Sequence, residues 1–166
     1  MAATEQSAPA GSRIRARLAQ LNLPLPEVAA PVAAYVPAIV TGSLVQTSGQ
    51  LPFVKGALPL TGKVGAEVTP EAAARLAAAC CLNALAAIEA EIGDLDRIVR
   101  IVKVTGYVAS DPAFSGQPAV INGASELLGQ VFGEVGRHAR AAVGVAVLPL
   151  DAPVELDLLV EIAPAD

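Results

Sequence analysis

The sequence predicts a single α+β domain built on one sheet, with two helices packed on one face of that sheet. Its segments show either the alternation of strands or the recurrence of helices, in the order strand, strand, helix, strand, helix, strand, strand. A chain of 166 residues suits one such domain. Because the two helices cover only one face of the sheet, the other face needs a further partner.

The composition indicates association between subunits and argues against nucleic-acid binding. Hydrophobic residues make up 54% of the chain and charged residues 16%, which gives more apolar surface than a small monomer readily buries. The formal net charge of −5 disfavours binding to phosphate backbones. No apolar run approaches the roughly 20 residues that span a bilayer, and residues 1–12 lack the pattern of a secretory signal. We expect a cytoplasmic protein without a membrane or nucleic-acid partner.

The first part of the chain, residues 1–31, is expected to form an N-terminal extension. Ser12 is placed to cap a short helix, whose apolar residues are Ile14, Leu18 and Leu21. Four prolines within residues 23–37 then predict an extended segment. Tyr35 lies in that segment.

Residues 38–41 and 44–48 predict a hairpin around a Gly42-Ser43 turn. The second strand ends at Ser48 and is followed by Gly49, which permits backbone conformations that other residues avoid. A strand end followed by a turn is the plain structural interpretation of these residues.

A long helix is predicted over residues 70–92. Thr69 can cap its first turn, Pro70 suits the first helical position, and Gly93 suits the residue just after the end. Apolar residues cover most of its circumference, so the helix should be deeply buried. Residues 98–109 are apolar and β-branched at successive positions, which predicts an interior strand.

A second helix is predicted over residues 117–135 from apolar residues at helical spacing. Asn122 lies beside that apolar stripe and should have a hydrogen-bond partner, for which nearby backbone is the ordinary choice. The last segment, residues 136–162, predicts a hairpin of two strands.

Each strand of this predicted hairpin places charged groups on one face. Arg140 shares a face of the first strand with a row of very small residues, Ala142, Gly144 and Ala146. Glu155 and Asp157 lie on the second strand opposite an unbroken apolar face. Spacing alone favours a half-buried hairpin with a charged outer face.

Familiar catalytic motifs are not found. His138, the one histidine, has no cysteine or carboxylate at metal-ligand spacing, and no glycine-rich phosphate loop is present, so we expect neither metal nor nucleotide. A nucleophile and base pair of Ser48 and His138 lacks the Gly-x-Ser-x-Gly turn of serine hydrolases. The adjacent Cys80 and Cys81 are interpreted as small core residues.

Taken together, these segments resemble the RidA family, also called the YjgF/YER057c/UK114 or endoribonuclease L-PSP family, over residues 32–163. The resemblance depends on Thr47-Ser48-Gly49-Gln50-Leu51-Pro52, on the helix start Thr69-Pro70-Glu71, on the helix with Asn122, on Ala139-Arg140-Ala141-Ala142-Val143, and on Leu148-Pro149 followed by an acidic strand. The amino-acid sequences of several of these motifs resemble a branch of the family that is distinct from the best-known deaminases.

The resemblance implies a chorismate-mutase-like α+β fold with a six-stranded mixed sheet, assembled as a homotrimeric barrel with clefts between subunits. It implies that Arg140 holds a substrate carboxylate and that Glu155 helps to hold the hydrolytic water. The residues implied to bind substrate beside Arg140 are Tyr35, Ser48, Gly49 and Asn122.

The implied reaction is the hydrolytic deamination of a reactive 2-imino or enamine acid to a 2-keto acid and ammonia, with no cofactor. A second hypothesis is a non-catalytic module that binds a small carboxylate in the same cleft, and a third is an endoribonuclease, which the negative charge disfavours. Ala33 and Ala34 replace the glycine and proline usual before the tyrosine, and Ala142 replaces a cysteine that some members carry. Arg140 and Glu155 do not oppose one another in a simple hairpin register, so we expect their cooperation to need a neighbouring subunit.

Overall fold

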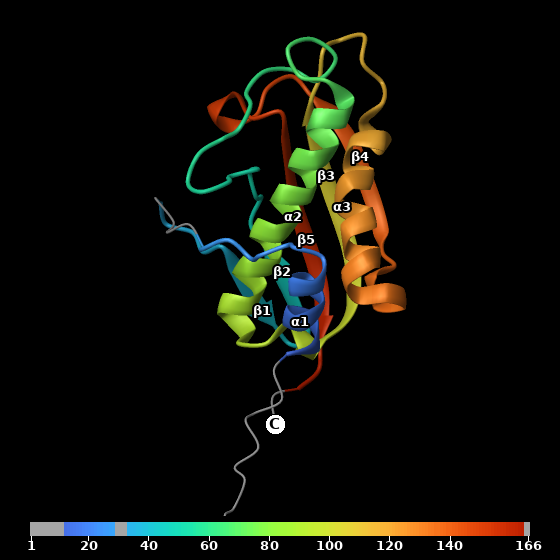
Figure 1. The fold of residues 1–166 in the computed structure, drawn as a ribbon. Coiled ribbons are helices and arrows are strands. Elements are labelled where there is room, and N and C mark those ends of the chain that lie inside the picture. Colours follow the sequence, from blue (N-terminus) through green and yellow to red (C-terminus); the bar gives the residue numbers. More distant parts are fainter. Residues whose placement is uncertain (1–11, 29–32, 165–166) are drawn as a thin grey trace, which may run out of the picture.

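The computed structural model describes residues 12–28 and 33–164. Three helices form one layer against a five-stranded sheet with strand order β1-β2-β5-β3-β4 (Figure 1). The helices are α1 (Arg13–Gln20), α2 (Pro70–Ile92) and α3 (Gln117–Phe132). The strands are β1 (Ala38–Thr41), β2 (Leu44–Thr47), β3 (Ile98–Ala109), β4 (Ala139–Val145) and β5 (Val154–Ile162). The α+β class is confirmed, but the sheet has five strands where six were predicted.

The two strands of the predicted hairpin over residues 136–162 do not pair with each other, so that prediction is wrong. β3 lies between them, parallel to β4 and antiparallel to β5. The connection from β3 through α3 to β4 is a crossover, which joins parallel neighbours in a sheet. After β4, a short 3₁₀ helix (Pro149–Asp151) leads the chain to the far side of β3. β4 therefore forms one edge of the sheet.

The first hairpin is confirmed, with β1 antiparallel to β2 around a turn where Gly42 has φ 59°. The long helix is confirmed at both ends, because Thr69 accepts a hydrogen bond from the amide of Ala72 and Gly93 has φ 86°. By length and composition α2 could cross a membrane, but 61% of its most apolar window is buried inside the domain. α3 ends three residues before the predicted end at residue 135 and continues as a short 3₁₀ helix (Gly133–Gly136).

The short N-terminal helix, α1, is tied to the domain by the carboxylate of Asp96. This carboxylate accepts hydrogen bonds from the hydroxyl of Ser12 and from the backbone amides of Arg13 and Ile14, at 2.8 to 2.9 Å. Burial alone would raise the pKa of Asp96, but these donors outweigh it and lower that pKa to about 2. Leu18, on the inner side of the helix, is buried in the core. Residues 1–11 and 29–31 of the predicted extension, and residue 32 after it, lie outside the described residues.

Alternation along the strands gives the sheet two different faces. On β5, Val154, Leu156 and Leu158 are fully buried against the helix layer, whereas the residues between them are only partly buried. The second face has no covering element within the described part of the chain, and it exposes apolar side chains such as Ile39 and Val143, which are 56% and 44% exposed. This open face is the one for which the sequence predicted a partner.

The helix layer depends on a close approach between α2 and α3 at Gly123. A Cβ at this position would overlap the backbone carbonyl of Ala74, whereas a Cβ at Gly129, on the same helix, would meet nothing within 4 Å. Gly123→Ala should therefore lower the free energy of unfolding by about 1–3 kcal/mol. Gly129→Ala should raise it by about 0.5–1 kcal/mol, because alanine restricts the unfolded chain.

Urea denaturation of the two variants checks this pair. Equal effects of the two substitutions would contradict the assigned contact between the helices.

Candidate active site

Arg140 lies near the start of the edge strand β4, with its side chain directed toward α3. Its Nη1 donates to Oδ1 of Asn122 at 2.8 Å and to Oγ of Ser125 at 3.3 Å. Within residues 12–28 and 33–164, the hydrogen bonds of Arg140 all use Nη1. The Nε and Nη2 groups of the exposed guanidinium thus remain available to an anion.

Helix and strand periodicity explain why these side chains meet. Asn122 and Ser125 are three residues apart on α3 and share one face of the helix. Ala142 and Gly144 follow Arg140 at strand period and so lie on the same side of β4. A Cβ at Gly144 would come within 2.8 Å of Nε2 of Gln117, at the start of α3. The small residue at position 144 therefore allows the side chain of Gln117 to pack closely against β4.

His138 also belongs to the group of side chains around Arg140. Sequence reasoning missed this placement of His138. Its Nε2 lies 2.9 Å from Oγ of Ser125, and its Nδ1 lies 2.6 Å from the carbonyl oxygen of Gly136. The imidazole is therefore close to Ser125, not to Ser48. The spacing of Ser125, three residues after Asn122 on the predicted helix, could have placed Ser125 beside Asn122, but no pattern in the sequence joins it to His138. We call Asn122, Ser125, His138 and Arg140 the arginine cluster.

A second group of predicted site residues includes Glu155 on the open face and the chain segments that adjoin Gly49. Gly49 packs against this side chain so closely that a Cβ at position 49 would overlap Oε1 of Glu155. The hydroxyl of Ser48 donates to the carbonyl of Val36 at 2.6 Å, which ties the segment before β1 to the end of β2. Tyr35 lies in that segment with its side chain 52% exposed. We call Tyr35, Ser48, Gly49 and Glu155 the glutamate group.

The surroundings of Glu155 on the open face raise the pKa of its carboxyl group. Burial, and then the charge of Asp157, raise its pKa above the ordinary value for glutamate. Asp157 accepts hydrogen bonds from the Tyr107 hydroxyl and the Gln46 side-chain amide, each at 3.2 Å. Glu155, with its raised pKa, is the carboxyl group on this face that is suited to take up a proton.

The two groups lie on opposite faces of the sheet, which the predicted hairpin did not allow for. Arg140 contacts the helix layer, whereas Glu155 alternates with residues buried in that layer and so faces away from it. β3 separates β4 from β5 by roughly 10 Å. Across the sheet, Val104 of β3 is paired with Arg140 on one side and with Leu158 on the other. Leu158 is three residues from Glu155, so Arg140 and Glu155 are also separated by about 10 Å along the strand direction. One small ligand cannot touch both residues in one copy of the chain.

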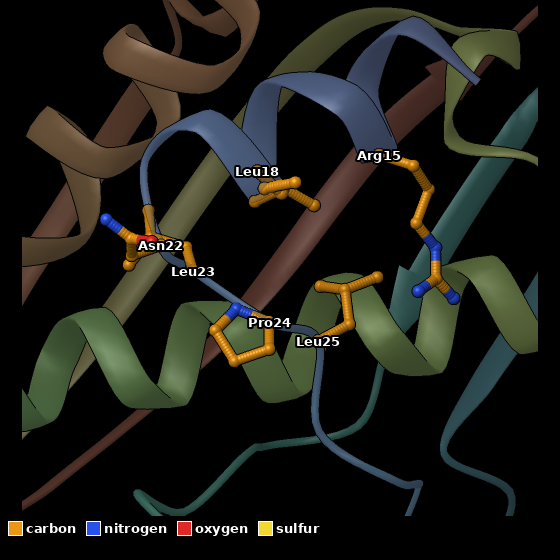
Figure 2. A pocket seen from close by; sticks show the side chains of 7 residues that line it. Arg15, Leu18, Asn22, Leu23, Pro24 and Leu25 are labelled. Atoms are coloured by element: carbon orange, nitrogen blue, oxygen red, sulfur yellow. The ribbon is translucent and has the colours of Figure 1, made fainter. Parts of the chain in front are cut away.

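A hollow of about 370 Å³ lies elsewhere, between α1 and the segment that follows it (Figure 2). Leu18, Leu23 and Leu25 line it together with Pro24, and Arg15 at its rim pairs with Glu89 of α2. None of the predicted site residues borders it. Its lining is largely apolar and its one arginine is paired with Glu89, so it lacks the available guanidinium that makes the arginine cluster a candidate for carboxylate binding.

Comparison with known proteins assigns the chain to a family. Residues 15–162 match the family described as "YjgF/chorismate_mutase-like, putative endoribonuclease". The chain belongs to the YjgF/RidA family. Protein TCP17 of Trypanosoma cruzi is 46% identical over 154 residues, which are 92% of this chain and 96% of that protein.

Solved structures of YjgF/RidA proteins have the same fold. The crystal structure of Atu1372 from Agrobacterium tumefaciens superposes with a TM-score of 0.86 at 48% identity, covering 91% of this chain and 93% of that one. TdcF of E. coli, crystallised with bound serine, superposes with a TM-score of 0.57 at 26% identity, covering 82% and 94%. The chorismate-mutase-like fold predicted from the family resemblance is confirmed.

Of the residues that the YjgF/RidA resemblance selects, the structure brings Arg140 together with Asn122, and Glu155 together with Gly49. Ser48 and Tyr35 lie on the chain segments that adjoin Gly49. The resemblance did not select Ser125 and His138, which complete the surroundings of Arg140.

Proposed function

We propose that this protein hydrolyses reactive 2-imino or enamine acids to 2-keto acids and ammonia. The observation that carries the proposal is the Arg140 guanidinium, which is held on one side by Asn122 and Ser125 and has no partner on its other side among the described residues. A carboxylate accepts two parallel hydrogen bonds from such a fork, and hydrogen bonds to charged groups contribute roughly 1.5–3 kcal/mol each. The bound serine of TdcF, which carries a carboxylate, supports this choice of ligand class.

The chemistry then requires a water molecule beside the imine carbon. Water adds to the carbon of the protonated C=N bond while a base takes a proton from that water. The base then returns this proton to the nitrogen of the carbinolamine, and loss of the hydroxyl proton breaks the C–N bond, which releases ammonia and leaves the 2-keto acid. The Glu155 carboxylate suits this role because its raised pKa makes it a stronger base than an ordinary glutamate. The protonated imine is itself electrophilic, so positioning of water is the main contribution asked of the protein.

Assembly as a homotrimer is part of the proposal. The arginine cluster and the glutamate group lie on opposite faces of one chain, so a complete site needs Arg140 of one copy and Glu155 of another. The open face, and the edge of the sheet that β1 forms, expose apolar residues suited to an interface, among them Val36, Ile39, Val40 and Val143. In a ring of identical subunits each interface then forms one site.

A carboxylate-binding module without catalysis is the second candidate. It is favoured by the absence of any carboxylate from the contacts of Arg140 among the described residues. In that case the arginine cluster alone would bind the ligand.

An ammonia-release assay with freshly generated 2-iminopropanoate, combined with calorimetric titration of pyruvate, tests the two candidates. The deaminase proposal expects ammonia release well above the uncatalysed rate together with pyruvate binding. Binding without ammonia release across several imino acids would select the module. If neither is observed, both candidates are wrong.

A further inference from the structure

We propose that His138 and Ser125 are positioning residues that fix the orientation of the Arg140 guanidinium for carboxylate binding. This inference rests on the proposed function, because it concerns how the same arginine meets its ligand. It starts from a chain of contacts that runs from Gly136 through His138 and Ser125 to Arg140.

The direction of each hydrogen bond follows from the groups involved. The carbonyl of Gly136 can only accept, so Nδ1 of His138 carries the proton in this contact. In the neutral imidazole Nε2 is then an acceptor, and it receives the hydroxyl proton of Ser125. The Ser125 oxygen presents its lone pairs to Nη1 of Arg140. Each residue thus determines the donor or acceptor role of the next.

The Gly136 end of this series of hydrogen bonds is fixed by packing. Gly136 is buried, and a Cβ there would overlap the backbone carbonyl of Leu128 on α3. The carbonyl that holds the imidazole is therefore set against the same helix that presents Asn122 and Ser125. Both acceptors of Nη1 are held on α3, so the free edge of the guanidinium has one preferred direction.

Substitution of Ser125 or His138 should affect ligand binding by changing the orientation of the Arg140 guanidinium and not its charge. Without the hydroxyl of Ser125, or without the imidazole that orients it, Arg140 keeps its charge and its contact with Asn122 but can rotate more freely. Loss of one such hydrogen bond should raise KM for the imino acid and Kd for pyruvate by about tenfold. The value of kcat should change by less than about twofold, because these residues do not touch the reacting carbon.

Nitrogen NMR tests the hydrogen-bond directions without any ligand. His138 is the only histidine, so protein labelled with ¹⁵N-histidine gives the spectrum of one imidazole. At alkaline pH we expect the neutral tautomer with the proton on Nδ1 and an unprotonated Nε2. A proton on Nε2 would overturn the inference.

Kinetics of four variants test the effect on Arg140. Ser125→Ala and His138→Phe should each raise KM and Kd as stated, the double variant should be no worse than either, and Ser125→Thr should restore binding because it retains the hydroxyl. Arg137→Ala is the matched control, since this arginine is highly exposed and pairs only with the exposed Glu134 among the described residues. It should bind and turn over like the wild type.

Two results separate positioning from a general structural role. In an Arg140→Lys background, Ser125→Ala should change KM by less than about twofold, because a lysine has no planar fork to orient. Thermal denaturation shows whether His138→Phe still folds, and Ser125→Ala carries the test if it does not.

Unchanged KM and Kd in folded Ser125→Ala would overturn this inference and leave the proposed function intact. A wild-type protein that neither binds pyruvate nor releases ammonia would overturn the proposed function, and the tautomer would still report on the hydrogen-bond chain.

Discussion

Arg140→Ala should lower kcat/KM for ammonia release from 2-iminopropanoate by about two orders of magnitude or more, and should abolish detectable pyruvate binding. The substitution removes the charged fork, and the loss of a bidentate contact of about 3 kcal/mol corresponds to roughly a hundredfold. Because Arg140 is exposed on an edge strand, the fold and assembly should persist. Steady-state kinetics, calorimetry and light scattering measure these three results.

The control for this variant is Arg137→Ala, which removes an equal charge three residues away on the chain. Comparable losses in both variants would show that general electrostatic attraction, and not a specific arginine, binds the substrate. Full activity of Arg140→Ala would contradict the proposed function. Arg140→Lys should retain part of the binding, because it keeps the charge but cannot form two parallel hydrogen bonds.

Mixed assemblies of two inactive variants should recover activity. Arg140→Ala lacks the carboxylate-binding group and Glu155→Gln lacks the base, so an assembly of either variant alone should have no competent site. Suppose that each site combines Arg140 of one copy with Glu155 of its neighbour. When the two variants mix randomly in equal amounts, both residues are then intact in about a quarter of all sites. Co-expression with two different affinity tags allows the mixed trimers to be isolated from the trimers of one variant alone. One interface of the three in each mixed trimer then has both intact residues, so ammonia release should approach about a third of the wild-type rate.

The control pairs Arg140→Ala with the double variant Arg140→Ala, Glu155→Gln. No site in that mixture can contain Arg140, so it should stay inactive. If Arg140→Ala and Glu155→Gln also fail to restore activity when they are isolated in one assembly, the two residues do not act across a subunit boundary. Activity of Glu155→Gln by itself would instead remove this residue from the mechanism.

Local sequence signals were sufficient for most individual elements. The cap at Thr69 and the glycine at position 93 gave the long helix its correct ends, because these residues act within one turn of chain. Alternation placed Val154, Leu156 and Leu158 on the buried face of their strand. The end of α3 was predicted three residues too late, because Gly133, with φ 60°, ends the α-helix before the apolar pattern does.

The family resemblance selected Arg140, Asn122, Gly49 and Glu155, and the structure groups them in two pairs. It did not select His138 and Ser125. Their contact joins residues 13 positions apart across an α3–β4 interface, and no periodicity within a single element reports such a contact.

The sequence by itself determined where helices and strands form and which side of each is apolar, because propensity, capping and alternation act between near neighbours. Only the tertiary structure decided that β3 lies between β4 and β5, because strand pairing is chosen by long-range packing of the α3 crossover against the sheet. That choice moved Arg140 and Glu155 from one predicted hairpin to opposite faces of the sheet. The same choice is the reason why a complete site, as proposed here, needs more than one copy of the chain.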